Sequence, residues 1–272
     1  MDLLSAARLG EAIERDAVED AIAATPAEVA RQLGLRVRRF GETAVVSASN
    51  APTVWVNRTI GLGLDGLPTD TTLDSIIDEL RAHAPAAFAL QISPLADRPE
   101  IGGWFAAKGL HYTGAWTRLV RGAEPPQPVK TEVRVEQAET ADAEHWATIL
   151  GVGFGLPVEM CVPFSATIGR PGWLHYLGYL GDQPVACAAM FVRDGSANLG
   201  YTATLPEARG RGAQSALIAR RIGDAIALGC RFLTAEVEES TEQHPNPSHF
   251  NLVRAGFTIA YNRHNWEGTA AD

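Results

Sequence analysis

The alternation of apolar and polar positions is clearest between residues 197 and 238. Residues 197–205 have the pattern of a strand, and residues 231–238 alternate in the same way. Between them, residues 213–228 place apolar side chains at helical spacing. The apolar positions are Leu217, Ile218, Ile222, Ala225 and Ile226. The pattern predicts a strand, a helix and a second strand in this order.

A further helix is predicted by its end signals within residues 246–256. Asn246 is a favourable N-cap, Pro247 suits the first helical position, and Gly256 suits the left-handed residue that stops a helix. Phe257 then leads into a last strand. Strands and helices therefore alternate through this region, as in an α/β fold.

Residues 122–130 divide the chain, because they are rich in proline and lack an apolar pattern. Such a segment is typical of a semi-rigid linker. The elements predicted after it are a strand at 133–135, a helix at 141–150, a second helix within 158–168, and strands at 173–180 and 184–193, which a turn at 181–183 separates.

The first part of the chain repeats this arrangement in a weaker form. Its predicted elements are helices at 3–14 and 17–33, a strand over 60–68 that ends in Leu67-Pro68, a helix at 73–81 and a helix end near 104–109. Gly109 follows its helix as Gly256 does, and Leu67-Pro68 matches Leu205-Pro206. The leading helices either cover the first lobe or shape a substrate cleft.

Composition is compatible with two globular lobes in 272 residues. Hydrophobic residues make up 46%, and no apolar run approaches the roughly 18 residues of a membrane span. Residues 1–5 lack the pattern of a secretory signal. Cys161, Cys187 and Cys230 show no metal-binding spacing and suit a reducing compartment. We therefore expect a cytoplasmic protein with buried cysteines.

The net charge of −9 argues against nucleic acid and membrane surfaces as partners, because both are bound by basic faces. A cationic substrate is compatible with this charge, and amines with a pKa of roughly 10 are cations at neutral pH. Whether the chain forms a homodimer is left open by the sequence.

The strongest chemical signal is the glycine turn, Arg209-Gly210-Arg211-Gly212, between the strand and the helix. Backbone N–H groups of such a turn can converge on one point, and a helix N-terminus adds unpaired donors and partial positive charge. The turn predicts an anion site. It lacks the Lys-Ser/Thr pair of a Walker loop and the three spaced glycines of a dinucleotide fingerprint.

The turn resembles the Arg/Gln-x-x-Gly-x-Gly/Ala motif of the GNAT superfamily of acyl-CoA-dependent N-acyltransferases. Arg209 and Gly212 match it, whereas Gln214 stands where the family has Gly or Ala. The Gly256-Phe257 pair after the last predicted helix resembles the family's exit into its final strand. A generic βαβ unit with a glycine-rich turn is the alternative.

The resemblance implies an α/β (α+β) protein of two GNAT-like lobes, each a mixed, mostly antiparallel sheet flanked by helices. Residues 1–122 would form a degenerate lobe with leading helices, residues 123–130 a linker, and residues 131–272 the acetyl-CoA-binding catalytic domain. The first lobe has Asp70 and Asp74 where the second has glycines, and these carboxylates would repel a pyrophosphate. An unrelated α+β cap is the alternative for the first lobe.

The resemblance also implies acetyl-CoA as acyl donor, without a metal. The glycine turn would hold the pyrophosphate, and the end of the preceding strand would contact the pantetheine arm. The cofactor-binding residues expected on this basis are Ala203, Thr204, Leu205, Arg209, Gly210, Arg211, Gly212, Ala213, Gln214, Ser215 and Asn246.

The side-chain catalysts are less well defined, because the family's usual acid and base are missing. Leu252 occupies the position of the family's tyrosine, which leaves Tyr201 and Asn251 as candidates for the acid. Glu236 and Glu238 share one face of their predicted strand and are the candidate bases. Their alternative is a solvated acidic edge. His175 and His249 are further bases of suitable intrinsic pKa.

The chemistry implied by the resemblance is direct acetyl transfer to a primary amine of a small molecule or peptide. A non-catalytic acyl-CoA sensor is a different possibility, since the usual acid and base are absent. A tandem acetyltransferase resembling mycothiol synthase is another. The acceptor cannot be read from the sequence.

Overall fold

The computed structural model describes residues 2–270 and separates them into two compact units. Unit 1 comprises Met1–Thr117 and Ala260–Asp272, and unit 2 comprises Arg118–Ile259. The expected domains, residues 1–122 and 131–272, differ from these units in two ways. The linker lies in unit 2, and the last residues lie in unit 1 because strand β11 (Thr258–Thr269) pairs there with β4 (Ala87–Gln91), from Asn265↔Gln91 to Thr269↔Ala87.

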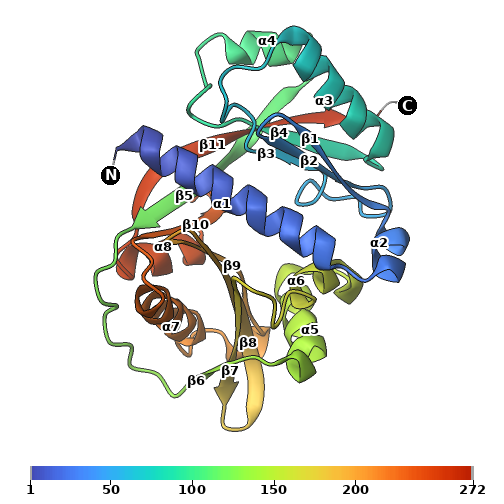
Figure 1. Ribbon diagram of the computed structural model, residues 1–272. Helices are drawn as coiled ribbons and strands as arrows, with labels where there is room; N and C mark the ends of the chain where they lie inside the picture. Colours follow the sequence, from blue (N-terminus) through green and yellow to red (C-terminus); the bar gives the residue numbers. More distant parts are fainter. Residues whose placement is uncertain (1, 271–272) are drawn as a thin grey trace. The chain divides into compact units, whose positions relative to one another are not determined.

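Unit 1 consists of a sheet and four helices (Figure 1). The remaining strands are β1 (Leu35–Phe40), β2 (Thr43–Ala48), β3 (Arg58–Ile60) and β5 (His111–Arg121), and the helices are α1 (Leu3–Ala24), α2 (Ala27–Leu33), α3 (Asp70–His83) and α4 (Ile101–Ala107). The strand order is β1-β2-β3-β4-β11-β5. The pairs β1–β2, β2–β3 and β4–β11 are antiparallel, and the pair β3–β4 is parallel.

Two predicted elements of unit 1 differ from the structure. Helix α1 is continuous to Ala24, whereas a break was expected between residues 14 and 17; the chain instead leaves the helix at Thr25, before Pro26. The strand expected over 60–68 is wrong: β3 ends at Ile60, because Gly61, Gly63 and Gly66 follow with φ of 76°, 92° and 106°.

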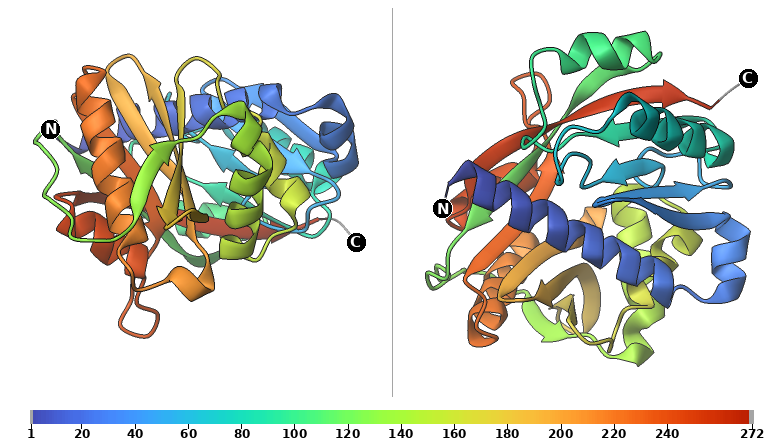
Figure 2. Two further views of the ribbon diagram at one scale, coloured as in Figure 1. Left: turned by 90° about the horizontal axis from the view of Figure 1, so that it is seen from below. Right: turned by 45° about the horizontal axis from the view of Figure 1, so that its top comes forward.

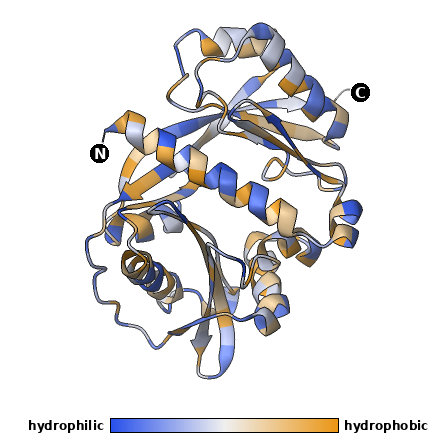
Figure 3. Ribbon diagram, in the orientation of Figure 1, coloured by the Kyte–Doolittle hydropathy of each residue, from blue (hydrophilic) through white to orange (hydrophobic). Residues whose placement is uncertain are grey.

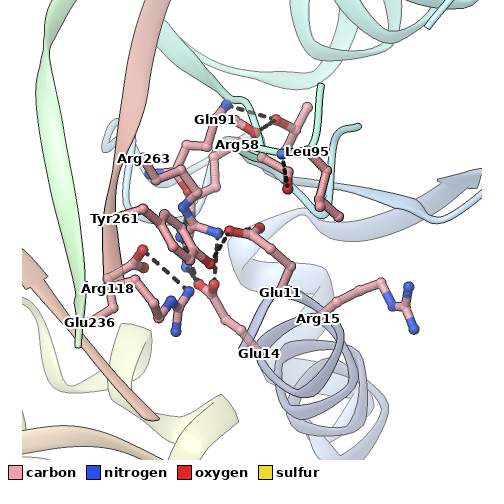
Figure 4. A network of polar contacts seen from close by, with 12 residues as sticks. Glu11, Glu14, Arg15, Arg58, Gln91, Leu95, Arg118, Glu236, Tyr261 and Arg263 are labelled. Carbon is pink, nitrogen blue, oxygen red and sulfur yellow. Dashed lines mark hydrogen bonds and ion pairs between the residues drawn. The ribbon is translucent and has the colours of Figure 1, made fainter. Parts of the chain in front are cut away.

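A buried ionic network ties α1 to strands of unit 1. Figure 3 shows hydrophilic and hydrophobic residues alternating along α1, and Figure 4 shows Glu11 and Glu14 pointing at Arg263. Glu11 accepts hydrogen bonds from Tyr261 (2.8 Å) and Arg263 (2.9 Å), and Arg58 donates to Glu14 (3.0 Å). Removing one member of a buried pair leaves an uncompensated charge, so a change that separated α1 from these partners would be strongly destabilising.

Unit 2 contains a set of hydrogen-bonded strands with helices on both faces. Its strands are β6 (Arg134–Gln137), β7 (Trp173–Leu180), β8 (Gln183–Arg193), β9 (Ser196–Thr204) and β10 (Phe232–Glu238), its helices are α5 (Ala143–Phe154), α6 (Val162–Ser165), α7 (Ala213–Ala227) and α8 (Pro247–Arg254), and short 3₁₀ turns lie at Thr140–Asp142, Val158–Cys161 and Pro206–Ala208. The order is β10-β9-β8-β7-β6. Neighbours are antiparallel except β9 and β10.

The helices of unit 2 form two layers around the sheet. In Figures 1 and 2, α7 and α8 lie on one face and α5 and α6 on the other. Leu217 and Ile222 of α7 pack with Leu199 and Leu233 in one core, as the helical spacing predicts. The second helix expected within 158–168 is present only as a 3₁₀ turn followed by the four-residue α6.

The two halves of the chain repeat one order of elements: three strands, a helix, a strand, a helix and a strand. The first set runs from β1 through α3, β4 and α4 to β5, and the second from β7 through α7, β10 and α8 to β11. Gly109 and Gly256 have φ of 80° and 88°, and each follows the C-cap residue of its helix, α4 or α8. The expected repetition and the α/β class are both confirmed.

Helix length and hydropathy bear on membrane insertion. Within residues 2–270, no single helix has the length and apolar composition needed to cross a membrane. Thr140–Phe154 and Val158–Ser165, bent by 111°, meet the requirement as a pair, by length and composition alone.

Candidate acyl-CoA cleft

The glycine turn connects β9 to α7 in the conformation that its residues predict. Gly210 and Gly212 have φ of 76° and 84°, a left-handed region that glycine enters without steric cost. Gly212 is the N-cap of α7, and no side chain accepts a hydrogen bond from the first N–H groups of this helix. The 15-residue helix therefore presents unpaired donors and its positive dipole end at the turn.

The two glycines differ in what surrounds them. A Cβ on Gly212 would lie 3.0 Å from both Cβ and Oγ1 of Thr131, so this position allows a close approach of the chain that follows the linker. A Cβ on Gly210 would meet no atom within 4 Å. Gly212 is therefore required by packing as well as by backbone conformation, whereas Gly210 faces open space.

A cleft of about 940 Å³ opens in front of the turn. It is lined by residues 126–130 of the linker, Gly153 and Phe154 of α5, Thr202, Ala203 and Thr204 of β9, Ala208, Arg209, Gly210 and Gly212 of the turn region, Ala213, Gln214, Ser215, Ala219 and Ile222 of α7, and Pro247, Ser248, Asn251, Arg254 and Ala255 at α8. Lys130, Arg209 and Arg254 are cations, and none of the lining residues is Asp or Glu. In a chain of net charge −9, this lining favours an anionic ligand.

A β-bulge lies directly upstream of the cleft. Ala189 pairs with Gly200 and Cys187 with Ala203, so Tyr201 and Thr202 oppose the single residue Ala188. Tyr201 has φ of 51°, a strained value for a side chain of this size.

The bulge coincides with the separation of β9 from β10. The parallel ladder covers four pairs, from Phe232↔Ser196 to Ala235↔Leu199, although both strands continue beyond it. The end of β9 thus lines the cleft, where its backbone can contact an extended ligand.

A buried arginine supports the bulge from the α7 side. Arg221 donates to the carbonyl oxygens of Ala189 (3.0 Å), Gly200 (3.2 Å) and Leu217 (3.1 Å). Its side chain is 2% exposed, and burial lowers its pKa to about 10. The guanidinium therefore holds two strands and a helix together where the strand pairing is irregular.

Gln214, the departure from the family motif, bridges α7 and α8 at the cleft wall. Its Nε2 donates to Ser248 Oγ at 2.8 Å, and its Oε1 accepts a hydrogen bond from Asn251. Arg254 donates in turn to Asn251 Oδ1. The longer side chain thus builds a polar network of which every member lines the cleft.

Eight of the eleven expected cofactor-binding residues line the cleft: Ala203, Thr204, Arg209, Gly210, Gly212, Ala213, Gln214 and Ser215. Leu205, Arg211 and Asn246 do not. Arg211 pairs with Glu132 at 2.9 Å. Asn246 caps α8 by accepting from Ser248 N at 2.9 Å, and its Nδ2 donates to the carbonyl of Glu238. Its role in the structure is that of an N-cap.

The expected catalytic residues lie in different surroundings. Asn251 lines the cleft. Tyr201 stacks on Phe164, with ring centroids 4.1 Å apart. The structure places Leu252, at the family's tyrosine position, in the core with 5% exposure.

The two carboxylates of β10 also differ. Glu236 receives a hydrogen bond from the fully buried Arg118 at 3.2 Å, and their side chains point at each other in Figure 4. Glu238 is exposed at the end of the strand. A base held by an arginine is a poor proton acceptor, so of these two Glu238 retains the better chemistry for that role.

His175 is buried rather than poised for proton transfer. Its Nε2–H donates to the carbonyl of Phe164 at 3.1 Å, and its ring stacks on Trp173. Burial lowers the pKa of His175 to about 4, which keeps the imidazole neutral at physiological pH. His249, the other expected base, lies on α8 and is not among the residues of the cleft.

The corresponding position of unit 1 is closed by side chains. Thr69 caps α3, and the first-turn carboxylate of Asp70 accepts from Trp104 Nε1 at 2.7 Å. Lys108 Nζ lies 3.0 Å from Asp70 and 2.6 Å from Asp74. The hydrogen bond from Trp104 and the neighbouring Lys108 lower the pKa of Asp70. Protein carboxylates thus occupy the helix terminus at which unit 2 has its glycine turn.

Several cleft residues could not be identified from the sequence. The composition of the linker indicated only a spacer, yet residues 126–130 form one wall of the cleft. Gly153 also lines the cleft. A Cβ there would lie 2.4 Å from that of Ala203, so glycine is required by a contact between α5 and β9 that no local pattern indicates. Ser248 and Arg254 lie on the predicted last helix, and the helical spacing of its polar residues is the signal that could have identified them as cleft residues.

Side chains that could bind a metal or act as thiol nucleophiles are dispersed or buried in residues 2–270. Across the described part of the chain, no three His, Cys, Asp or Glu side chains gather in a way that could hold a metal ion. Cys161, Cys187 and Cys230 are free and buried. Burial raises the pKa of the Cys161 thiol to about 11, so this thiol is a poor nucleophile.

Comparison with known proteins identifies the class of the fold. No curated protein sequence matches the chain. Solved structures of similar fold include a GCN5-related N-acetyltransferase from Sphaerobacter thermophilus (15% identity over 85% of this chain and 81% of that one, TM-score 0.60) and one from Kribbella flavida (15%, 93% and 96%, 0.60). A tandem GNAT protein from the clavulanic acid biosynthesis pathway covers 96% of both chains at 15% identity, with a TM-score of 0.58.

Part of unit 2 matches a family model in sequence. Residues 155–244, which include β9, the glycine turn and α7, match the acetyltransferase (GNAT) family. The resemblance to the GNAT superfamily, in a tandem arrangement, is thereby confirmed. The match indicates acyl transfer as the general chemistry.

Proposed function

We propose that the protein is an acyl-CoA-dependent N-acyltransferase that transfers acetyl from acetyl-CoA to a primary amine. The observation that carries this proposal is the cleft at the glycine turn, whose charged lining residues are all cations. Open space at Gly210 and the uncapped N-terminus of α7 fit a pyrophosphate, because both leave backbone donors available. A cytoplasmic location and a small-molecule or peptide acceptor are part of the same proposal.

Different residues of the cleft would bind the phosphates and the pantetheine arm of acetyl-CoA. The N–H groups at the start of α7 and the guanidinium of Arg209 would hold the phosphates. Ala203 and Thr204, beyond the bulge, would contact the pantetheine arm through the backbone. When bound, acetyl-CoA would supply a thioester carbonyl as the electrophile.

Transfer requires a neutral amine, a donor for the developing oxyanion and a proton for the leaving thiolate. Glu238 would attract the ammonium form of the acceptor and pass its proton to water. A backbone N–H near the bulge, held in place by the hydrogen bonds of Arg221, would stabilise the oxyanion. Tyr201 is the candidate proton donor to the thiolate, whereas Asn251, which lines the cleft, could stabilise the thiolate only by a hydrogen bond from its amide. In that case the proton released by the amine would be the one that the thiolate takes up.

Amine-dependent release of free coenzyme A tests the proposal. Purified protein is incubated with acetyl-CoA and a panel of small amines, amino acids, aminoglycosides and peptides, and the free thiol is measured. Release that depends on one class of amine supports the transferase and identifies its acceptor class. Tight binding of acetyl-CoA without release by any amine would contradict it.

A non-catalytic sensor of acyl-CoA is the second candidate function. It is favoured by Leu252, which places a core side chain at the family's tyrosine position, and by the pairing of Glu236 with Arg118. Sensor and enzyme share the cleft, so only turnover separates them.

A further inference from the structure

The proline-rich linker is attached at both ends to the elements that form the cleft. At its start, Arg121 of β5 donates to the carbonyl of Ala255 at the end of α8 (3.0 Å) and to that of Glu124. This arginine is 8% exposed and lies over the ring of Phe257. The beginning of the linker is therefore fixed to the C-terminus of α8.

The other end of the linker is fixed to the glycine turn. Thr131 Oγ1 donates to the carbonyl of Arg211 at 2.6 Å, and Glu132 pairs with the Arg211 guanidinium at 2.9 Å. The carbonyl oxygen of Lys130 would lie 3.9 Å from a Cβ on Gly212. Lys130 is therefore next to the turn at which the helix N-terminus is open.

Between these attachments, residues 126–130 line the cleft. Figures 1 and 2 show this segment passing α8 and α7 on its way from β5 to β6. Pro126 and Pro128 restrict its backbone, so little entropy is lost when it is held in one conformation. A segment that is anchored twice and stiffened by proline is a wall of the cleft rather than a free tether.

Lys130 is the only charged side chain of this wall. It has a flexible four-carbon stem and three donors, which suit a phosphate of variable position. The cleft's other two cations, Arg209 and Arg254, come from the turn and from α8. The three cations thus come from three separate segments.

We propose that the linker is part of the acyl-CoA site, with the Lys130 ammonium binding a phosphate of the nucleotide end. The proposal rests on the proposed function, because it assigns a ligand contact in the same cleft. The group that Lys130 would bind is a phosphate anion, either the 3′-phosphate or the pyrophosphate of coenzyme A.

The sequence offers an internal control for testing this contact. The chain has two lysines, Lys108 and Lys130, and Lys108 is engaged by Asp70 and Asp74 in unit 1. Reductive methylation of the wild-type protein, followed by peptide mass spectrometry, reports both lysines in one sample. With acetyl-CoA at ten times its Kd, modification of Lys130 is expected to slow about tenfold, while Lys108 reacts at an unchanged rate.

Titration of Lys130 variants with acetyl-CoA measures how much the same contact contributes to binding affinity. Lys130→Ala is expected to weaken acetyl-CoA binding about tenfold, as for a charge-assisted hydrogen bond at a partly exposed site. Lys130→Arg should retain most of the affinity. Arg231→Ala is the matched control, because it removes one exposed positive charge of unit 2 outside the cleft.

Coenzyme A and dephospho-coenzyme A identify the phosphate concerned. If the loss in Lys130→Ala disappears with dephospho-coenzyme A, the contact is to the 3′-phosphate; if it persists, the contact is to the pyrophosphate. Wild-type binding with unprotected Lys130 and equal affinity in Lys130→Ala and Arg231→Ala would overturn the inference and leave the proposed function intact. Absence of wild-type binding would instead refute the proposed function.

Discussion

Replacing Gly210 with aspartate or with asparagine isolates the charge preference of the glycine turn. Gly210 has φ of 76°, and a Cβ there would meet no atom within 4 Å. Asn and Asp are the side chains that tolerate the left-handed region best, and they have nearly the same shape. The backbone strain is therefore nearly equal in the two variants, and their difference is one negative charge at the cleft surface. Gly212 is less suitable, since a side chain there would press on Thr131.

The magnitude follows from Coulomb's law at the protein surface. A carboxylate roughly 5 Å from a phosphate charge, at an effective dielectric constant of about 20, is repelled by about 3 kcal/mol. Screening by salt and the exposure of the turn reduce this to about 1.5–3 kcal/mol. Gly210→Asp should therefore bind acetyl-CoA about 10–100-fold more weakly than Gly210→Asn.

The assay is calorimetric titration of both variants and the wild type with acetyl-CoA at two salt concentrations. The gap between the variants should narrow at the higher salt concentration, because the repulsion is electrostatic. Thermal unfolding of each variant checks that both are folded equally well. Equal affinity of Gly210→Asp and Gly210→Asn would refute the placement of an anion at this turn.

Three further predictions concern single side chains. Glu238→Gln should lower turnover about tenfold or more with little effect on acetyl-CoA affinity, whereas Glu242→Gln should change neither; rates equal to wild type would leave Glu238 in a solvated acidic edge. Because the folded-state pKa of His175 lies at about 4, below its usual 6.5, the unfolded state takes up the proton first. The contribution of His175 to the free energy of unfolding is therefore present above pH 6.5 and falls by about 2–4 kcal/mol as the pH drops to 4. In urea titrations, the free energy of unfolding of the wild type should therefore depend more steeply on pH than that of His175→Gln. Asn246→Ala should lower the free energy of unfolding by about 1 kcal/mol through loss of the α8 cap, with Asn246→Asp close to wild type; a large loss of acetyl-CoA affinity in the folded Asn246→Ala would return this residue to the ligand site.

The elements that the sequence predicted well are those whose signals are local. Helix α7 and strands β9 and β10 follow from apolar spacing, and α8 follows from Asn246, Pro247 and Gly256. The glycine turn could be recognised because positive φ values require specific residues. Each of these signals lies within a few residues of the element that it specifies.

The features that could not be predicted depend on contacts between distant segments. The last strand leaves the lobe that precedes it because β11 pairs with β4, and pairing partners are not encoded in the alternation of one strand. Glu236 appeared as available as Glu238 on the strand, yet Arg118, 118 positions earlier, binds one of them. The linker has the composition of a spacer, and its role as a cleft wall arises from Arg121 and Thr131 at its ends.

The stoichiometry and affinity of acetyl-CoA binding to the wild-type protein test the central claim most directly. Calorimetric titration is expected to give one site per chain, because unit 2 has the open glycine turn and the corresponding helix terminus of unit 1 is engaged by Asp70 and its partners. Binding should weaken as salt concentration rises, since in the proposed complex the cleft cations contact phosphate. Two equivalent sites would contradict the degenerate role of the first lobe, and no binding would contradict the assignment of the cleft itself.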